Sequence, residues 1–220
     1  MFVSKWMTPN VITVDKNESL GTALRLMREN RIRRLPVVSG GKLVGIVSDR
    51  DLKGALPSRA TSLDVWELHA LIDKLKVSEI MTKNVVTTKP GATIERVAMI
   101  MMERKIEGLP VLDAKGGLVG IVTEGDVFRA LTEVTGVGQK TTRISLVLPD
   151  KAGSIMEVAD LVRARSGRIY SILSTKAKVA NGQRELVMRV MLGANGVADL
   201  KKDLTSRYGE VSVLSDPELA

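Results

Sequence analysis

The chain of 220 residues contains no cysteine, which excludes a disulfide framework and a zinc site built on thiolates. It contains a single histidine, His69, which excludes a His-rich metal site and leaves one candidate for imidazole chemistry. Aromatic residues make up only 3% of the chain, although 44% of it is hydrophobic. We therefore expect a globular protein whose cores consist mainly of Val, Ile, Leu, Met and Ala.

Long hydrophobic runs are also missing. No stretch approaches the roughly 18 apolar residues of a membrane helix, and the first residues, MFVSKWMTPN, lack the apolar run of a signal peptide. We expect a cytoplasmic protein with no membrane contact. The formal net charge is +8, with the excess of basic residues spread over residues 1–65 and 138–220. This spread favours a solvated surface, and nucleic-acid binding remains the weaker alternative.

An internal repeat dominates the first two thirds of the chain. The segment that begins at Met7 resembles the segment that begins at Met81, at an offset of 74 residues. The offset becomes 75 at Gly45 and Gly120, because a Gly-rich turn is one residue longer in the second copy. A strand–turn–strand unit tolerates an insertion at such a turn. Similarity of this length indicates a duplication.

Each copy has the pattern of a βαββα unit. A β-branched run is followed by an apolar helical face, two apolar strands around the Gly-rich turn, and a short final helix. The strands are predicted at 11–14, 35–38 and 43–47, and at 85–88, 109–112 and 118–122; the final helices are predicted at 49–56 and 124–131. One such unit is too small to bury much surface alone, so we expect the two copies to pack face to face.

The predicted organisation has four parts. The first repeat covers residues 1–65, an amphipathic connecting helix covers 66–76, and the second repeat covers 77–137. From residue 141 to 216 the pattern changes to strand, helix, strand, strand, helix, strand, which predicts a ferredoxin-like sandwich. The predicted fold class is therefore α+β throughout.

The third strand of both repeats ends in the same short motif, a hydroxyl residue followed three residues later by an aspartate. Ser48 and Thr123 stand at a strand-to-helix junction, and Asp51 and Asp126 follow three residues later. A hydroxyl there can cap the helix and direct its free amides at an anion, while the carboxylate can accept hydrogen bonds from a ribose. The preceding glycine would let a ligand approach the backbone. An ordinary N-cap with an acidic residue in the first turn is the alternative. Because both repeats carry the same hydroxyl and carboxylate, we favour a nucleoside-phosphate site.

With these residues, the duplicated part resembles tandem CBS domains, the Bateman module, whose repeats end in Gly-x-x-(Ser/Thr)-x-x-Asp. The resemblance implies that the hydroxyls contact phosphate, the carboxylates bind ribose, and backbone near the first strand holds the base. The matching positions are Ser48, Asp51, Thr13, Thr123, Asp126 and Thr87. It also implies a regulatory adenosine ligand (AMP, ADP, ATP or S-adenosylmethionine), with no catalytic cofactor and no metal.

The copies differ just before their Leu-Pro pair, where the first has Arg33 and Arg34 and the second has Glu107 and Gly108. Basic residues at this place contact phosphate in several members of the family. A guanidinium can hold a phosphate bidentately, whereas Glu107 would repel it. We predict two unequal crevices, with the more highly charged group in the one that carries the arginines. A solvated helix end is the alternative.

The C-terminal third resembles an ACT domain, whose first loop carries Asp-x-x-Gly before a helix. Here these residues are Asp150 and Gly153, with Ala152 where many members have proline. The resemblance implies an amino acid bound between two such domains; a plain dimerisation sheet is the alternative. A CBS pair followed by an ACT domain resembles the acetoin-utilisation (AcuB) family.

The expected function follows from these resemblances and from the lack of any nucleophile motif or metal cluster. We expect a non-catalytic, homodimeric regulator that senses an adenine nucleotide and acts on an unidentified partner protein. An enzyme is the rival class.

Overall fold

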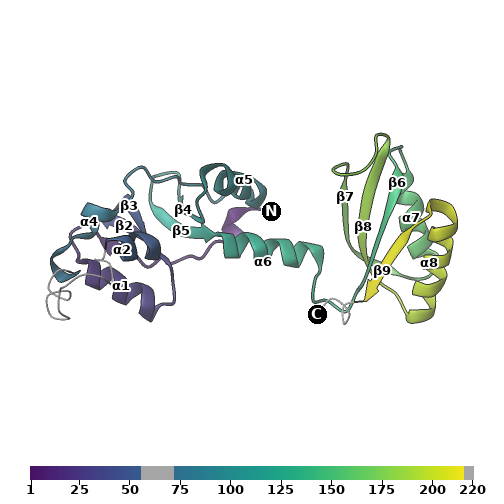
Figure 1. The fold of residues 1–220 in the computed structure, drawn as a ribbon, viewed down its shortest axis with the longest axis horizontal. Coiled ribbons are helices and arrows are strands. Elements are labelled where there is room, and N and C mark those ends of the chain that lie inside the picture. The colour runs from purple at the N-terminus through teal and green to yellow at the C-terminus, as the bar shows by residue number, and fades with distance from the viewer. Residues whose placement is uncertain (56–71, 216–220) are drawn as a thin grey trace. The chain divides into compact units, whose positions relative to one another are not determined.

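The computed structural model describes residues 1–55 and 72–215. The chain divides into two compact units, residues 1–130 and residues 131–220 (Figure 1). Most of the predicted connecting helix, including His69, lies outside the described residues; residues 72–74 are helical.

The first repeat has the predicted order of elements: β1 (Val14–Asp15), α1 (Leu20–Glu29), β2 (Arg34–Ser39), β3 (Lys42–Ser48) and α2 (Asp49–Gly54). β1 pairs with β2 in parallel, and β2 pairs with β3 in antiparallel register. The second repeat has α5 (Ile94–Arg104), β4 (Gly108–Leu112), β5 (Leu118–Thr123) and α6 (Glu124–Thr135). Its first strand is reduced to one parallel bridge between Thr88 and Val111.

The first predicted strand of each repeat was too long. Pairing begins only at Val14 in the first copy, and in the second copy only Thr88 bridges a strand. Val11 and Ile12, and Val85 and Val86, line crevices between the repeats and do not pair with a neighbouring strand. Their β propensity therefore reflects a position against a partly buried surface.

The amphipathic helices α1 and α5 agree with the predicted pattern. Each begins at a hydroxyl cap: Ser19 Oγ accepts from Thr22 N at 3.1 Å, and Thr93 Oγ1 accepts from Arg96 N at 3.2 Å. Side chains on the face with helical spacing are buried in the core of their repeat; they are Leu20, Ala23 and Met27 in α1, and Ile94, Val97 and Met101 in α5.

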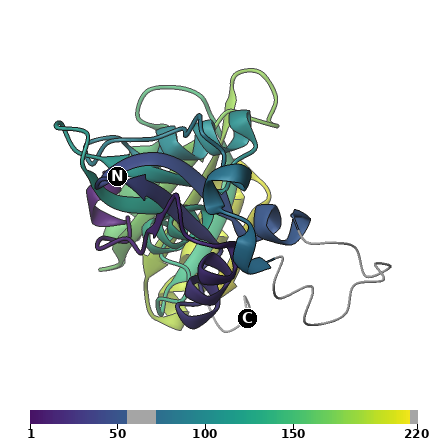
Figure 2. The same cartoon turned by 90° about the vertical axis from the view of Figure 1, so that its left-hand side faces the viewer.

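The two repeats exchange their leading segments. The N-terminal turn η1 (Val3–Lys5) packs in the core of the second repeat through the fully buried Val3, and α4 (Val77–Ile80) packs in the core of the first through Val77. In Figure 1 and Figure 2 the purple N-terminal segment lies against the teal strands of the second repeat. Each core is therefore completed by the other copy's first residues.

Paired backbone hydrogen bonds fasten both exchanges. Thr8 bonds Ile121 in both directions, with N···O distances of 2.9 and 3.0 Å. Ile46 and Thr82 form the same pair at 3.0 and 2.9 Å. The repeats are thus joined by two short antiparallel bridges at equivalent positions.

Gly45 and Gly120 have a different role from the predicted one. A Cβ at Gly45 would stand 2.4 Å from Met81 Sδ, and one at Gly120 would stand 2.5 Å from Met7 Sδ. The space above each glycine is filled by a methionine of the exchanged segment, so neither glycine serves the approach of a ligand. The expectation was wrong because the sequence does not reveal the exchange.

The C-terminal unit has the predicted βαββαβ order: β6 (Thr142–Pro149), α7 (Ser154–Arg163), β7 (Arg168–Thr175), β8 (Gln183–Met191), α8 (Ala194–Tyr208) and β9 (Val211–Ser215). The strands form one antiparallel sheet in the order β7-β8-β6-β9, with both helices on one side (Figure 1). Its core is aliphatic and lies between sheet and helices; it includes Ile144, Leu148, Val158, Val162, Leu186, Met188, Leu200 and Leu204.

We predict that Gly120→Ala lowers the stability of residues 1–130 by about 1–3 kcal/mol, because the new methyl group meets Met7 Sδ and the Thr8 carbonyl, 3.2 Å away. Urea unfolding followed by circular dichroism measures the loss. Gly91→Ala, where a Cβ has open space, is the control. The packing argument would be contradicted if Gly120→Ala lowered the free energy of unfolding no more than Gly91→Ala does. It would also be contradicted if adding Met7→Ala to Gly120→Ala did not reduce the destabilisation.

Candidate functional site

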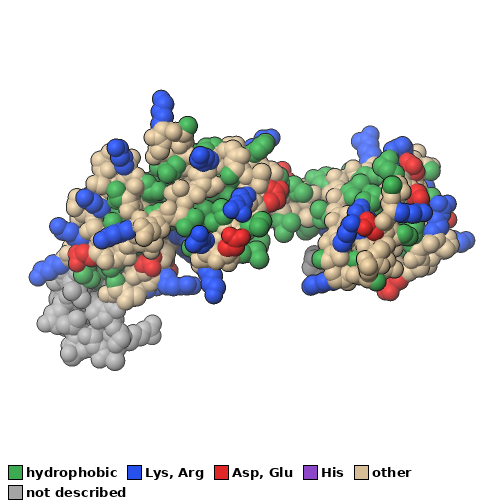
Figure 3. Space-filling view, turned by 90° about the horizontal axis from the view of Figure 1, so that it is seen from above, with side chains coloured by type: hydrophobic (Ala, Val, Ile, Leu, Met, Phe, Trp, Pro, Cys, Tyr) green, Lys and Arg blue, Asp and Glu red, His purple; other side chains and the backbone are tan. Residues whose placement is uncertain are grey.

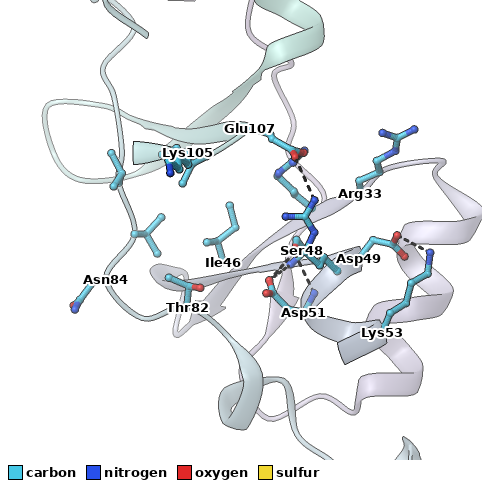
Figure 4. A pocket seen from close by; sticks show the side chains of 16 residues that line it. Arg33, Ile46, Ser48, Asp49, Asp51, Lys53, Thr82, Asn84, Lys105 and Glu107 are labelled. Atoms are coloured by element: carbon cyan, nitrogen blue, oxygen red, sulfur yellow. Dashed lines mark hydrogen bonds and ion pairs between the residues drawn. The ribbon is translucent and has the colours of Figure 1, made fainter. Parts of the chain in front are cut away.

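Two crevices lie where the repeats meet. The first crevice has a volume of about 600 Å³ and the second about 510 Å³, sizes that suit a small organic ligand. Ser48 and Asp51 of the first repeat line the first crevice (Figure 4), and Thr123 and Asp126 of the second repeat line the second. The structure thus places all four predicted motif residues in crevices.

Each crevice takes its opposite wall from the other repeat. The residues facing Ser48 and Asp51 come from the segment after the exchanged helix α4; they are Thr82, Asn84, Val85 and Val86. The residues facing Thr123 and Asp126 come from the corresponding N-terminal segment; they are Thr8, Asn10, Val11 and Ile12. A ligand in either crevice would therefore touch both repeats.

Thr13 and Thr87 are half-buried and line neither crevice. The neighbouring Val11 and Ile12, or Val85 and Val86, stand in the crevices instead, and each pair belongs to the repeat that does not supply the Asp. Sequence reasoning missed this crossing because similarity between the copies does not show which copy faces which.

Ser48 and Asp51 form a capping box at the start of α2. One carboxylate oxygen, Asp51 Oδ2, accepts from Ser48 N at 2.8 Å and from Ser48 Oγ at 2.6 Å, while Asp51 N donates to Ser48 Oγ at 3.3 Å. Among the described residues, nothing donates to the second oxygen, Oδ1. Ser48 therefore caps α2, as the alternative prediction held. The second carboxylate oxygen of Asp51 remains available to accept from a hydroxyl of a ligand.

Thr123 and Asp126 repeat this arrangement with one addition. Asp126 Oδ2 accepts from Thr123 N at 2.8 Å and from Thr123 Oγ1 at 2.9 Å. Asp126 Oδ1 accepts from Arg129 Nη2 at 3.0 Å, one helical turn further along α6. The Asp126 side chain is 3% exposed, whereas that of Arg129 is 64% exposed. The two crevices thus differ in how far their carboxylate is already occupied.

A basic residue in left-handed backbone conformation stands at each crevice. Arg31, with φ of 53°, lines the second crevice, and Lys105, with φ of 54°, lines the first. These are equivalent positions of the two repeats. Lys105 is the C-cap of α5 and Arg31 follows the C-cap of α1, so the left-handed conformation is that of an ordinary helix end. Neither residue was singled out from the sequence as a site residue.

We predicted that Arg33 and Arg34 would belong to only one crevice. In the structure both arginines line both crevices, and so does Glu107. Arg34 Nη2 forms an ion pair with Glu107 Oε2 of the other repeat, marked by the dashed line that ends on Glu107 in Figure 4. Arg33 is exposed, and Figure 4 shows it directed away from Ser48 and Asp51. The predicted inequality therefore cannot come from arginines confined to one side.

The family model for the CBS domain matches residues 3–58 and 77–133. The chain belongs to the CBS-domain family. A CBS domain-containing protein of Dictyostelium discoideum is 36% identical over 141 residues, which cover 61% of this chain and 93% of that protein. The inosine-5'-monophosphate dehydrogenase of Korarchaeum cryptofilum is 42% identical over 119 residues, which cover 54% of this chain but only 22% of the dehydrogenase.

Solved CBS structures resemble the pair. CBSX2 from Arabidopsis thaliana, in complex with AMP, has 36% identity and a TM-score of 0.50 over 60% of this chain and 97% of its own. The CBS pair of protein MJ0100, in complex with 5'-methylthioadenosine and S-adenosyl-L-methionine, has 31% identity and a TM-score of 0.50 over 60% of this chain and 95% of its own. The α+β fold of the tandem CBS pair is thereby confirmed.

The C-terminal loop before α7 carries Asp150 and Gly153. Asp150 Oδ2 lies 2.5 Å from Lys176 Nζ, and Asp150 Oδ1 accepts from Arg184 Nε at 3.0 Å. The hydrogen bond from Lys176 and the two positive charges hold the pKa of this carboxyl below its ordinary value. Gly153 caps α7 with φ of 90°. In this structure, Asp150 ties the loop to the β7–β8 hairpin.

Three further observations concern the described part of the chain. No cluster of three or more His, Cys, Asp or Glu side chains is arranged to hold a metal. No helix in it has the length and apolar character needed to span a bilayer. On the face seen in Figure 3, Lys and Arg side chains are scattered over the surface and separated by other residues. Cytoplasmic location stays a prediction.

We predict that Asp126→Ala lowers the stability of the CBS pair by about 1–3 kcal/mol, because the half-buried Thr123 amide and hydroxyl lose the acceptor that the buried Asp126 carboxylate provides. Guanidinium unfolding measures the change. Asp51→Ala, in a half-buried capping box, should cost less; equal costs for the two variants would contradict the burial argument.

The lowered pKa of Asp150 predicts a pH dependence. Since the folded-state pKa lies below the unfolded one, the stabilising effect of the ionised carboxylate is complete above the unfolded pKa and is lost as pH falls through the folded pKa. Titration of the Asp150 carboxyl by NMR should show this low pKa. Lys176→Gln should raise it toward the ordinary value, whereas Lys178→Gln should not; equal effects would refute the assignment.

Proposed function

We propose that the protein is a non-catalytic regulator whose CBS pair binds an adenine nucleotide (AMP, ADP or ATP) in the two crevices. One observation carries this proposal. Each crevice combines a capped helix start and carboxylate from one repeat with apolar backbone and a left-handed basic residue from the other. The AMP complex of CBSX2 supports the ligand class.

The parts of each crevice suit the parts of a nucleotide. In the first crevice, the hydroxyl of Ser48 and the cation of Lys105 suit a phosphate, and the open oxygen of Asp51 suits a ribose hydroxyl. The apolar Val85 and Val86 suit a base. Thr123 and Arg31 take the corresponding roles in the second crevice, where a ribose hydroxyl would share Asp126 Oδ1 with Arg129. Thr13 and Thr87 support these walls from one or two residues away.

The regulatory effect would arise because a bound nucleotide touches both repeats. A ligand that binds one relative arrangement of the repeats more tightly shifts the population toward it. In both crevices the motif carboxylate accepts two hydrogen bonds from the hydroxyl residue at the start of its helix, which supports a role in binding and regulation. The dehydrogenase and other enzyme relatives match over a small share of their length, in keeping with a regulatory module.

S-adenosylmethionine is the second candidate ligand, because the MJ0100 pair binds it together with 5'-methylthioadenosine. Both candidates share the adenosine group. They differ in charge next to it, since a nucleotide carries an anionic phosphate and S-adenosylmethionine a sulfonium cation. The basic side chains of Arg33, Lys105 and Arg31 in the crevices favour the phosphate.

We further propose that residues 141–216 form a ferredoxin-like sandwich of the ACT kind, which serves amino-acid sensing or homodimerisation. The βαββαβ order and the sheet order β7-β8-β6-β9 support this assignment. Asp150 and Gly153 mark the loop that would take the amino acid in such a domain. The regulated partner would be a protein that contacts the CBS pair or its dimer.

The decisive test is isothermal titration calorimetry with AMP, ATP and S-adenosylmethionine. Asp51→Asn and Asp126→Asn should each remove one binding event or weaken it at least about tenfold, because the amide keeps a single acceptor oxygen, which Ser48 or Thr123 already engages, and has a donor in place of the second. Thermal melting of each variant shows that it is folded, and Glu103→Gln, exposed and outside both crevices, is the charge control. Absence of binding by the wild-type protein, or unchanged binding in both Asn variants, would refute the proposal.

A further inference from the structure

The ion pair between Arg34 and Glu107 stands where the two crevices adjoin. Both residues line the first crevice and both line the second. The Arg34 side chain is 17% exposed and that of Glu107 is 43% exposed. Arg50 Nη2 lies 3.9 Å from the other carboxylate oxygen of Glu107. A charged group in either crevice would therefore meet the same guanidinium and the same carboxylate.

The duplication allows only one such arginine. Gly108 is the counterpart of Arg34 in the second repeat, and a Cβ at Gly108 would lie 3.1 Å from Arg34 Cδ. The stem of Arg34 thus occupies the space that a side chain at position 108 would need. Where the repeats meet, the Arg34 guanidinium is paired with Glu107 and lines both crevices.

We propose that Arg34 and Glu107 couple the two nucleotide sites, so that a phosphate bound in one crevice weakens phosphate binding in the other. This inference rests on the proposed function and adds to it a coupling between the two nucleotide sites. A phosphate competes with Glu107 for Arg34, because both are anions that a guanidinium binds bidentately. Once Arg34 has turned to the first phosphate, the second crevice keeps the Glu107 carboxylate and has lost one of its cations.

The coupling depends on the charge of the ligand. An uncharged nucleoside such as adenosine leaves the ion pair intact, so its two binding events should be independent. Asp51→Asn and Asp126→Asn each keep one intact site. The AMP dissociation constant of each variant therefore gives the affinity of its remaining site alone. The wild-type isotherm should then show a second event about fivefold weaker than those constants predict.

Glu107→Gln is the sharpest variant, because the amide has nearly the same shape as the carboxylate and releases Arg34. It should tighten AMP binding about fivefold, reduce the discrepancy between the wild-type isotherm and the isotherms of the two Asn variants, and leave adenosine binding unchanged. Glu103→Gln removes the same charge from an exposed position on α5 outside both crevices and should change neither ligand. Adenosine binding by each variant shows that the crevices are formed.

The outcomes separate the inference from the function beneath it. Absence of binding by both AMP and adenosine in the wild-type protein would refute the proposed function. Binding of both ligands with the same effect of Glu107→Gln on each, or an AMP isotherm that equals the sum of the one-site isotherms, would overturn the coupling and leave the nucleotide site standing.

Discussion

The exchange of leading segments is the constraint on which the CBS pair depends. Val3 and Val77 each fill the core of the repeat to which they do not belong, and Met7 and Met81 lie over glycines of that same repeat. The backbone pairs at Thr8 and Thr82 hold these segments in register. Because the segments continue directly into the crevice walls, the same packing that completes the cores also brings the two halves of each crevice together.

Duplication produces two similar sites, but contact between the copies prevents them from being identical. Near the junction, two equivalent arginines would compete for one space, and the chain has Arg34 in one copy and Gly108 in the other. Further from it, Arg129 engages Asp126 while its counterpart in the first repeat is Gly54. Similarity therefore holds for the groups that suit ribose and base, and it fails for the cations. A protein with two crevices of one design thus has two different electrostatic environments.

Local patterns in the sequence were sufficient for the elements. The spacing of Leu20, Ala23 and Met27 predicted α1, since this signal acts within one or two turns. The motif residues Ser48 and Asp51 were also placed correctly in a crevice, because a capping box is local. What the sequence did not show was which copy faces which. The roles of Gly45, Thr13 and Lys105 depend on that long-range pairing, and no local signal encodes it.

The exchanged turn at the N-terminus has a consequence for how the chain is made. Thr8 must find Ile121, so the turn at Val3 waits for a strand that is synthesised more than a hundred residues later. Until then Val3 has no core to enter, and until Val77 has been synthesised the core of the first repeat is incomplete as well. Contacts of such separation slow folding. The nascent first repeat is therefore an incomplete intermediate with an exposed apolar turn, and synthesis of the second repeat is what ends its exposure.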